Sequence, residues 1–203
     1  MRKPAPADHP VLDLIRDRWS PRAFSDREVG PEVLRSLFEA ARWAPSSNNE
    51  QPWAFLVATR NEKAGFARAL EPLFPGNAAW ARRAFVLGYA VAKLAFAKNN
   101  APNRNSHYDT GAAMAMLTLE ATARGLGVHQ MAGFDAQAAR AVYAIPAGWE
   151  AIAAFAAGYP GDPASLPEGY RDREAAPRVR KPMREFVMSE KWGHTAPFVG
   201  EQV

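Results

Sequence analysis

The sequence predicts an α+β protein in which a small mixed or antiparallel sheet is surrounded by helices. One observation is the order of elements, α, α, β, α, β, α, α, β, α, in which strands are scarce for 203 residues. Another is that no repeat or linker divides the chain, so we expect one domain over residues 1–203. Finally, the segment 109–124 is almost entirely small or apolar and needs covering on every side. We therefore expect a second subunit to complete the core.

Proline positions and apolar spacing delimit the first elements. Pro10 opens a short helix with Val11, Leu14 and Ile15 on one face. A second helix is predicted over residues 31–43, because its apolar residues follow a 3.6-residue period and a proline at position 45 disfavours helix just before it. The polar stretch SSNNEQ then leads into WAFLVAT, a strand rich in aromatic and β-branched residues.

Capping residues delimit the middle of the chain. Asn61 is expected to cap a helix that extends to about Leu70. A segment punctuated by Pro and Gly, EPLFPGN, follows, and Phe85 to Val91 is predicted to be a buried strand. After the polar loop KNNAPNRNSH, the apolar helix 109–124 is expected to stop at Gly125.

The last third of the chain contains a capped helix, a strand and a short terminal helix. Asp135 caps a helix that ends before Ile145 and Pro146. Residues 151–157 are predicted to be a third strand, which runs into the turn GYPGDP. A loop is expected over 164–177, and a last helix near 182–188.

The composition excludes several classes of protein. Apolar residues are 48% and charged residues 23% of the chain, which argues against disorder, a collagen-like repeat and a coiled coil. Without cysteine there is no disulfide, thiolate nucleophile or cysteine-ligated metal, and no two histidines have HExxH spacing. The segment GLGVHQ lacks the third glycine of a dinucleotide fingerprint and follows a helix, so a Rossmann-bound nicotinamide is not expected.

Charge and hydropathy bear on partners and location. The net charge of +4 and the isoelectric point of about 9.6 suit a bound anion, a nucleic acid or no specific ligand. The longest uncharged apolar stretch, Ala84 to Ala92, is far shorter than the roughly 20 residues of a membrane span. The N-terminus has no apolar signal region. We expect a cytoplasmic protein with no membrane partner.

Alternate residues after the first helix form a candidate phosphate site. Arg18, Ser20 and Arg22 point the same way if the backbone is extended. Two guanidiniums and a hydroxyl on one side suit a phosphate, because arginine offers forked, charge-assisted donors. The alternative is a solvated basic turn.

The segment APSSNNEQPW, residues 44–53, is a second candidate site. Its amides offer both donors and acceptors, as the carbonyl and imide edges of a heterocycle require. The alternative is an Asx-rich turn with good capping chemistry.

Taken together, these segments resemble the nitroreductase family, FMN-dependent NAD(P)H oxidoreductases. RWSPRAF, a helix opened by Gly-Pro, and ARWAPSSNNEQPWAFLV follow in the order and spacing of that family's N-terminal signature. The resemblance continues through Asn77, ARGLG, HQMAGFD, AIAAFAAGYPGD and RVRKPMREFV, and covers residues 10–192. It implies a nitroreductase-like fold and an FMN-binding domain.

The resemblance implies which residues hold FMN. The first basic motif and a C-terminal basic pair would bind the phosphate, and the polar loop would lie along the isoalloxazine. Backbone N–H groups of a turn would face flavin N5 and O4. For the C-terminal pair the alternative is a solvated charge run, in which Lys181 and Arg184 could fill the same role. The implied residues are Arg18, Ser20, Arg22, Arg178 and Arg180 at the phosphate and Ser46, Ser47, Asn49, Asn77, Ala132 and Gly133 at the ring.

Four further aromatic or imidazole side chains are left outside the implied site. Trp43 and Phe134 are expected to be core residues, and His129 a buried histidine with its hydrogen bonds satisfied. Trp80 is likewise not assigned to the site. Many relatives carry a polar residue where this chain has Ala132, so the environment of N5 is expected to differ.

The implied activity is ping-pong hydride transfer from NAD(P)H through flavin N5 to a nitroaromatic, a quinone or a similar electrophile. The resemblance also implies a homodimer with the flavin at the subunit interface and no catalytic side chain. One alternative is different flavin chemistry on the same fold, either reductive dehalogenation or flavin breakdown. Another is a basic nucleic-acid-binding module, supported only by the isoelectric point; we expect no nucleic-acid partner.

Overall fold

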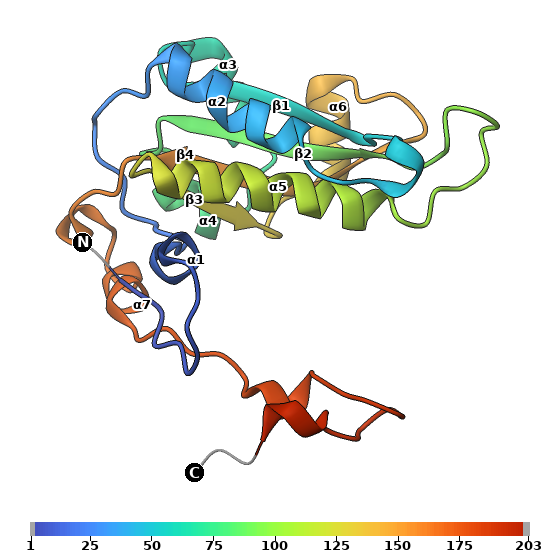
Figure 1. Cartoon of the computed structure of the whole chain (residues 1–203). Coiled ribbons are helices and arrows are strands. Elements are labelled where there is room, and N and C mark those ends of the chain that lie inside the picture. Colours follow the sequence, from blue (N-terminus) through green and yellow to red (C-terminus); the bar gives the residue numbers. More distant parts are fainter. Residues whose placement is uncertain (1–2, 201–203) are drawn as a thin grey trace.

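The computed structural model describes residues 3–200 and contains a four-stranded antiparallel sheet (Figure 1). At one edge β1 (Trp53–Thr59) pairs with β2 (Val86–Lys93). The next strand is β4 (Trp149–Gly158), which pairs with β3 (Gly127–Met131) at the other edge. The order β1-β2-β4-β3 confirms the α+β class and the antiparallel form of the predicted sheet.

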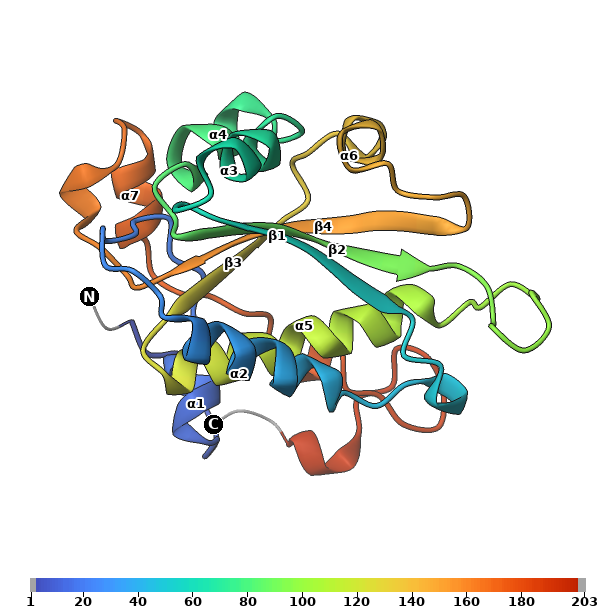
Figure 2. The same cartoon turned by 90° about the horizontal axis from the view of Figure 1, so that it is seen from above.

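Helices cover both faces of this sheet, as Figure 2 shows. On one face lie α2 (Pro31–Arg42) and α5 (Ser106–Ala123), and on the other lie α3 (Lys63–Leu70), α4 (Pro75–Ala81) and α6 (Ala136–Tyr143). Each face buries its own hydrophobic cluster against its helices. The sheet is therefore the middle layer of three, and its strands are apolar on both sides.

Short helices lie outside these layers. They are α1 (Asp13–Asp17) and α7 (Tyr170–Ala175), both drawn below the sheet in Figure 1. Three-residue 3₁₀ turns occur at Pro163–Ser165, Met183–Glu185 and Pro197–Val199. No helix in residues 3–200 has both the length and the apolar character needed to cross a membrane.

The strand predictions are confirmed for β1, β2 and β4, but the sequence analysis misses β3. Residues 53–59, 85–91 and 151–157 form strands whose ends differ from the predicted ones by at most two residues. The segment GVHQM, for which no strand is predicted and whose last three residues begin the expected turn HQMAGFD, is β3. It is five residues long, lacks apolar alternation and pairs only with β4, so little in its own sequence marks it as a strand.

The main helices are confirmed with corrected ends. Asp135 caps α6 as predicted, because its carboxylate accepts the N–H groups of Gln137 and Ala138. The predicted cap Asn61 is wrong, since α3 begins after Glu62. The apolar helix predicted over 109–124 begins earlier, at Ser106.

Other local predictions are wrong. The segment EPLFPGN contains the start of α4, because Pro75 stands in the first turn, where a helix tolerates proline. The loop predicted over 164–177 contains α7. The helix predicted near 182–188 is only the 3₁₀ turn Met183–Glu185.

One face of α5 stays exposed in the single chain. Ala113, Met114 and Leu117 are buried against the sheet, whereas Tyr108 is 80% and Met116 39% exposed. The expectation that this helix is covered on every side is therefore not met by residues of the same chain. A second subunit remains a prediction.

A substitution at Gly88 in β2 would test how closely the sheet is packed. A methyl group at this position would lie 2.5 Å from the Leu56 carbonyl oxygen and 2.5 Å from the Phe155 ring. We expect Gly88→Ala to lower the free energy of unfolding by roughly 1–3 kcal/mol, measured by urea denaturation. In α3, Gly65→Ala is the matched control, since its new methyl group has 3.7 Å to its nearest neighbours and should be neutral or stabilising by about 1 kcal/mol. Equal stability of the two variants would contradict the close approach at Gly88.

Candidate functional site

The five residues assigned to a phosphate line one cavity of about 190 Å³. They are Arg18, Ser20, Arg22, Arg178 and Arg180, called the anion cradle below. The first three come from the segment after α1 and the other two from the segment after α7, so the fold brings together positions more than 150 residues apart. Both basic motifs thus line the same cavity, whereas their binding of a phosphate stays a prediction. Arg180, rather than Lys181 or Arg184, lines this cavity.

The arginines of the anion cradle repel one another. Burial lowers the pKa of Arg18, and the positive charges of Arg178 and Arg180 lower it further. Arg18 donates a hydrogen bond to the Ser20 hydroxyl at 3.2 Å. Because the cluster carries an excess of positive charge on forked donors, it is suited to a doubly charged oxyanion.

Arg178 also holds the N-terminal segment in place. Its Nη1 donates to the carbonyl oxygens of Lys3 and Arg16, both at 2.8 Å. The Lys3 ammonium donates in turn to the Glu174 carbonyl oxygen. Residues before α1 therefore form one wall of the cradle, a contribution that the sequence analysis does not anticipate.

A buried carboxylate lies in the same cavity. Glu174, on α7, is 1% exposed and accepts the backbone N–H of Arg22 at 2.9 Å and that of Ala23 at 3.0 Å, both on Oε1. Its Oε2 accepts the Arg22 N–H at 3.0 Å. The sequence analysis misses this residue, because a glutamate in the charged run YRDREA has no signal that separates it from solvated neighbours.

The edge strand β3 supports the N-terminal half of the anion cradle. Nδ1 of His129 lies 3.1 Å from the Pro21 carbonyl oxygen. Gly127 leaves room for the Pro21 ring, since a methyl group there would lie 2.2 Å from Pro21 Cγ. The backbone between Ser20 and Arg22 is thus fixed by a hydrogen bond and by a close contact with the same strand.

Desolvation keeps the imidazole of His129 neutral rather than protonated. Its ring lies 4.6 Å from that of Trp80, which is fully buried, and the Arg22 guanidinium lies 6.0 Å from the Trp80 ring. Burial first, and the charge of Arg22 second, lower the pKa of His129 to about 4. The expected hydrogen bond of His129 is present, but its side chain is only half-buried. The expected burial of Phe134 is confirmed. The expectation for Trp43 is wrong, since this side chain is 72% exposed.

Asn77 and Gly133 also lie together, as the sequence analysis expects of two residues at the ring. Asn77 Nδ2 donates to the Gly133 carbonyl oxygen at 3.0 Å, and the Phe74 N–H donates to the same oxygen at 3.1 Å. The Phe134 N–H donates to the Ala132 carbonyl oxygen. These bonds use the carbonyl groups of the turn rather than the N–H groups of Ala132 and Gly133.

The polar loop is held by the start of α5. The Ser47 N–H donates to Asp109 Oδ2 at 3.0 Å, and the Ser46 hydroxyl accepts the Gln51 N–H at 3.0 Å. Asp109 is 4% exposed and was not anticipated as a contact of this loop. Asn49 has a positive φ of 53°, a conformation that asparagine tolerates better than most residues.

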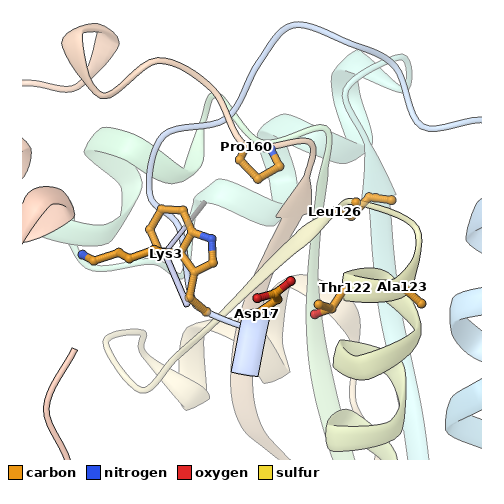
Figure 3. Close-up of a pocket in the computed structure, with 8 residues that line it drawn as sticks. Lys3, Asp17, Thr122, Ala123, Leu126 and Pro160 are labelled. Carbon is orange, nitrogen blue, oxygen red and sulfur yellow. The ribbon is translucent and has the colours of Figure 1, made fainter. Parts of the chain in front are cut away.

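A second cavity shows where the anion cradle lies relative to α5. It measures about 290 Å³ and shares Lys3 and Trp19 with the cradle cavity. Asp17 and Thr122 face each other across it (Figure 3). The cradle is therefore close to the C-terminal end of α5.

The polar loop and the anion cradle lie at opposite ends of α5 in one chain. Residues 109 and 122 are 13 positions apart, which is about 20 Å of helix. Figures 1 and 2 both show the loop after α2 at the far end of the molecule from α7. The structure thus places the eleven predicted residues in two groups, with Ser46, Ser47 and Asn49 apart from the other eight.

The half-buried imidazole of His129 predicts a pH dependence of stability. His129 is neutral in the folded chain down to about pH 4, whereas an unfolded histidine binds its proton near pH 6.5. Between these values the unfolded state binds more protons, so the free energy of unfolding falls as the pH is lowered from 7 to 4. His129→Gln should remove on the order of 2–3 kcal/mol of this fall, measured by urea denaturation in phosphate-free buffers. An unchanged slope, equal to that of the control His9→Gln at an exposed position, would refute the burial of a neutral ring.

Comparison with known proteins gives a consistent result. Residues 15–159 match the family model of the nitroreductase family. A solved structure of an oxidoreductase containing FMN has a TM-score of 0.88 at 30% identity, and the match covers 94% of this chain and 97% of that chain.

Two curated relatives have similar sequences. An uncharacterized 15.4 kDa protein of Mycolicibacterium smegmatis is 33% identical over 69% of this chain and 97% of its own length. The 5,6-dimethylbenzimidazole synthase of Rhodospirillum rubrum is 28% identical over 83% of this chain and 92% of its own length. The family match spans well over half of the sequence and agrees with the similarity of the fold, so the chain belongs to the nitroreductase family.

Proposed function

We propose that residues 1–203 form one FMN-binding domain of a cytoplasmic, homodimeric oxidoreductase. It would take reducing equivalents from NAD(P)H and pass them to a nitroaromatic, a quinone or a similar electrophile. The observation that carries the proposal is the convergence of both predicted basic motifs on one cavity. The FMN-containing oxidoreductase with a similar structure supports the choice of cofactor.

The anion cradle fits the phosphate of FMN. A phosphate monoester carries close to two negative charges at pH 7, and Arg18, Arg22, Arg178 and Arg180 offer forked donors to it. Burial first, and then the charges of Arg178 and Arg180, lower the pKa of Arg18, and a bound anion would relieve the repulsion between these charges. The Ser20 hydroxyl, already in contact with Arg18, would complete the set.

The turn at Gly133 fits the ring. Ala132 follows His129, beside the cradle, by three steps of about 3.3 Å along extended backbone, so the turn and the cradle are roughly 10 Å apart. The N–H groups of Ala132 and Gly133 would donate to the electron-rich edge of the flavin, and Asn77 would fix the turn through the Gly133 carbonyl. When bound, FMN supplies the hydride chemistry, so no side chain of this chain needs to carry a proton or a covalent bond.

A partner subunit would supply the polar loop. Ser46, Ser47 and Asn49 lie at the other end of α5 from the cradle of the same chain, about 20 Å along the helix, so they would act in the site of the partner. The exposed face of α5, with Tyr108 and Met116, is apolar surface that a second copy would cover. Asp109 would then position a loop that acts in the partner's site.

One alternative stays open to a direct test. The similarity to a 5,6-dimethylbenzimidazole synthase makes flavin breakdown worth measuring. Many turnovers of NAD(P)H with the flavin left intact would argue against it. The nucleic-acid-binding alternative has no further support, because the basic residues that gather do so in a cavity with a buried carboxylate.

The cofactor assignment is tested by the purified protein and by its flavin affinities. We expect two visible flavin bands and a released chromophore that behaves as FMN. Arg18→Ala and Arg180→Ala should each weaken FMN binding about 10- to 100-fold, since each removes a charge-assisted hydrogen bond, and should leave riboflavin binding nearly unchanged. Arg184→Ala, outside the cavity, is the matched control. A colourless protein that takes up no FMN would refute the proposal.

Mixed dimers test whether one site uses two chains. Arg18→Ala and Asn49→Ala homodimers should both be impaired in FMN retention and in NAD(P)H-dependent reduction. A dimer with one chain of each kind would have both changes in one site and none in the other. We expect it to recover about half of the wild-type activity and one FMN per dimer. No recovery in a purified mixed dimer would show that each site is built from a single chain.

A further inference from the structure

We infer that Glu174 is a positioning residue of the anion cradle, which fixes Arg22 and joins the two basic motifs before any anion binds. The inference rests on the proposed function, since it assumes that the cradle holds a phosphate. Its basis is the direction of the carboxylate: all three of its hydrogen bonds come from the backbone N–H groups of Arg22 and Ala23.

A buried carboxylate needs hydrogen-bond partners, and Glu174 finds them in the backbone. Oε1 alone accepts from two consecutive residues, at 2.9 and 3.0 Å. Such a bridge fixes the orientation of the peptide unit between Arg22 and Ala23, and so the direction in which the Arg22 side chain leaves the backbone. The residue before Arg22, Pro21, is held in place by its contacts with β3.

The same contact joins segments that are far apart in sequence. Glu174 lies on α7, four residues before Arg178 and six before Arg180. Its bonds to residues 22 and 23 therefore hold the C-terminal pair of arginines opposite the N-terminal pair. The charges themselves oppose this arrangement, since Arg178 and Arg180 lower the pKa of Arg18.

The effect of neutralising Glu174 on FMN binding separates the role of its hydrogen bonds from that of its charge. The carboxylate of Glu174 places a negative charge in the cavity proposed to bind an anion, so this charge alone would weaken phosphate binding. A glutamine keeps one oxygen that can accept both N–H groups and removes the charge. If position is what Glu174 contributes, Glu174→Gln should bind FMN as well as or better than the wild type, and Glu174→Ala should bind it worse.

The experiment compares FMN and riboflavin, which lacks the phosphate. The full-length protein is freed of flavin, and both affinities are measured by quenching of flavin fluorescence. We expect Glu174→Ala to weaken FMN binding at least about tenfold and riboflavin binding less than about threefold. Glu174→Gln should stay within about threefold of the wild type or bind FMN more tightly. Glu168→Ala, an exposed glutamate of the same segment, is the control for loss of a carboxylate.

Two results would overturn the inference. In one, Glu174→Gln loses FMN affinity as severely as Glu174→Ala, which would assign the effect to charge. In the other, Glu174→Ala weakens FMN and riboflavin equally, which would make the residue merely structural. If the alanine variant does not fold, Glu174→Asp, one methylene shorter, replaces it and should show a smaller loss with the same selectivity for FMN. A wild-type protein that binds FMN no better than riboflavin would instead refute the phosphate assignment itself.

Discussion

Electrostatic repulsion is the constraint on which this site depends. Arginines from two distant segments line one small cavity, where burial and then the charges of Arg178 and Arg180 lower the pKa of Arg18. Because the arginines do not attract one another, contacts with other groups must hold their backbone segments in place. The Glu174 bridge, the His129 bond to Pro21 and the Arg178 bonds to two carbonyl groups do this. The cradle is therefore preorganised by the fold rather than assembled by its ligand.

The same requirement explains why an edge strand matters more than its length suggests. β3 has five residues and one neighbour in the sheet. Its first residue, Gly127, leaves space for Pro21, and its third, His129, binds the Pro21 carbonyl. The turn that follows it carries Gly133, held by Asn77. The short strand β3 thus sets the spacing between the anion cradle and the turn at Gly133.

Sequence reasoning located the two basic motifs more reliably than the residues that hold them in place. The two basic motifs and the cap Asp135 are predictable because the chemistry lies in the side chains themselves, at a fixed local spacing. β3 was missed because it is short, lacks apolar alternation and pairs only with β4. Glu174 was missed because its partners, Arg22 and Ala23, lie more than 150 residues earlier in the sequence. Pro75 was treated as a break, although in the first turn of α4 it favours a helix. Asp109 has no local pattern that ties it to Ser47, 62 residues earlier.

The division of the site between the two ends of α5 links three equilibria, if the partner supplies the polar loop. A ligand held by the cradle of one chain and the loop of another binds only the dimer, so it stabilises the dimer by mass action. Assembly in turn removes exposed apolar side chains such as Tyr108 and Met116 from water, a gain that the folded monomer lacks. Cofactor binding, dimerisation and folding then reinforce one another. In such a dimer the chain would not need a large sheet or a fully covered helix of its own, because part of its core would lie between subunits.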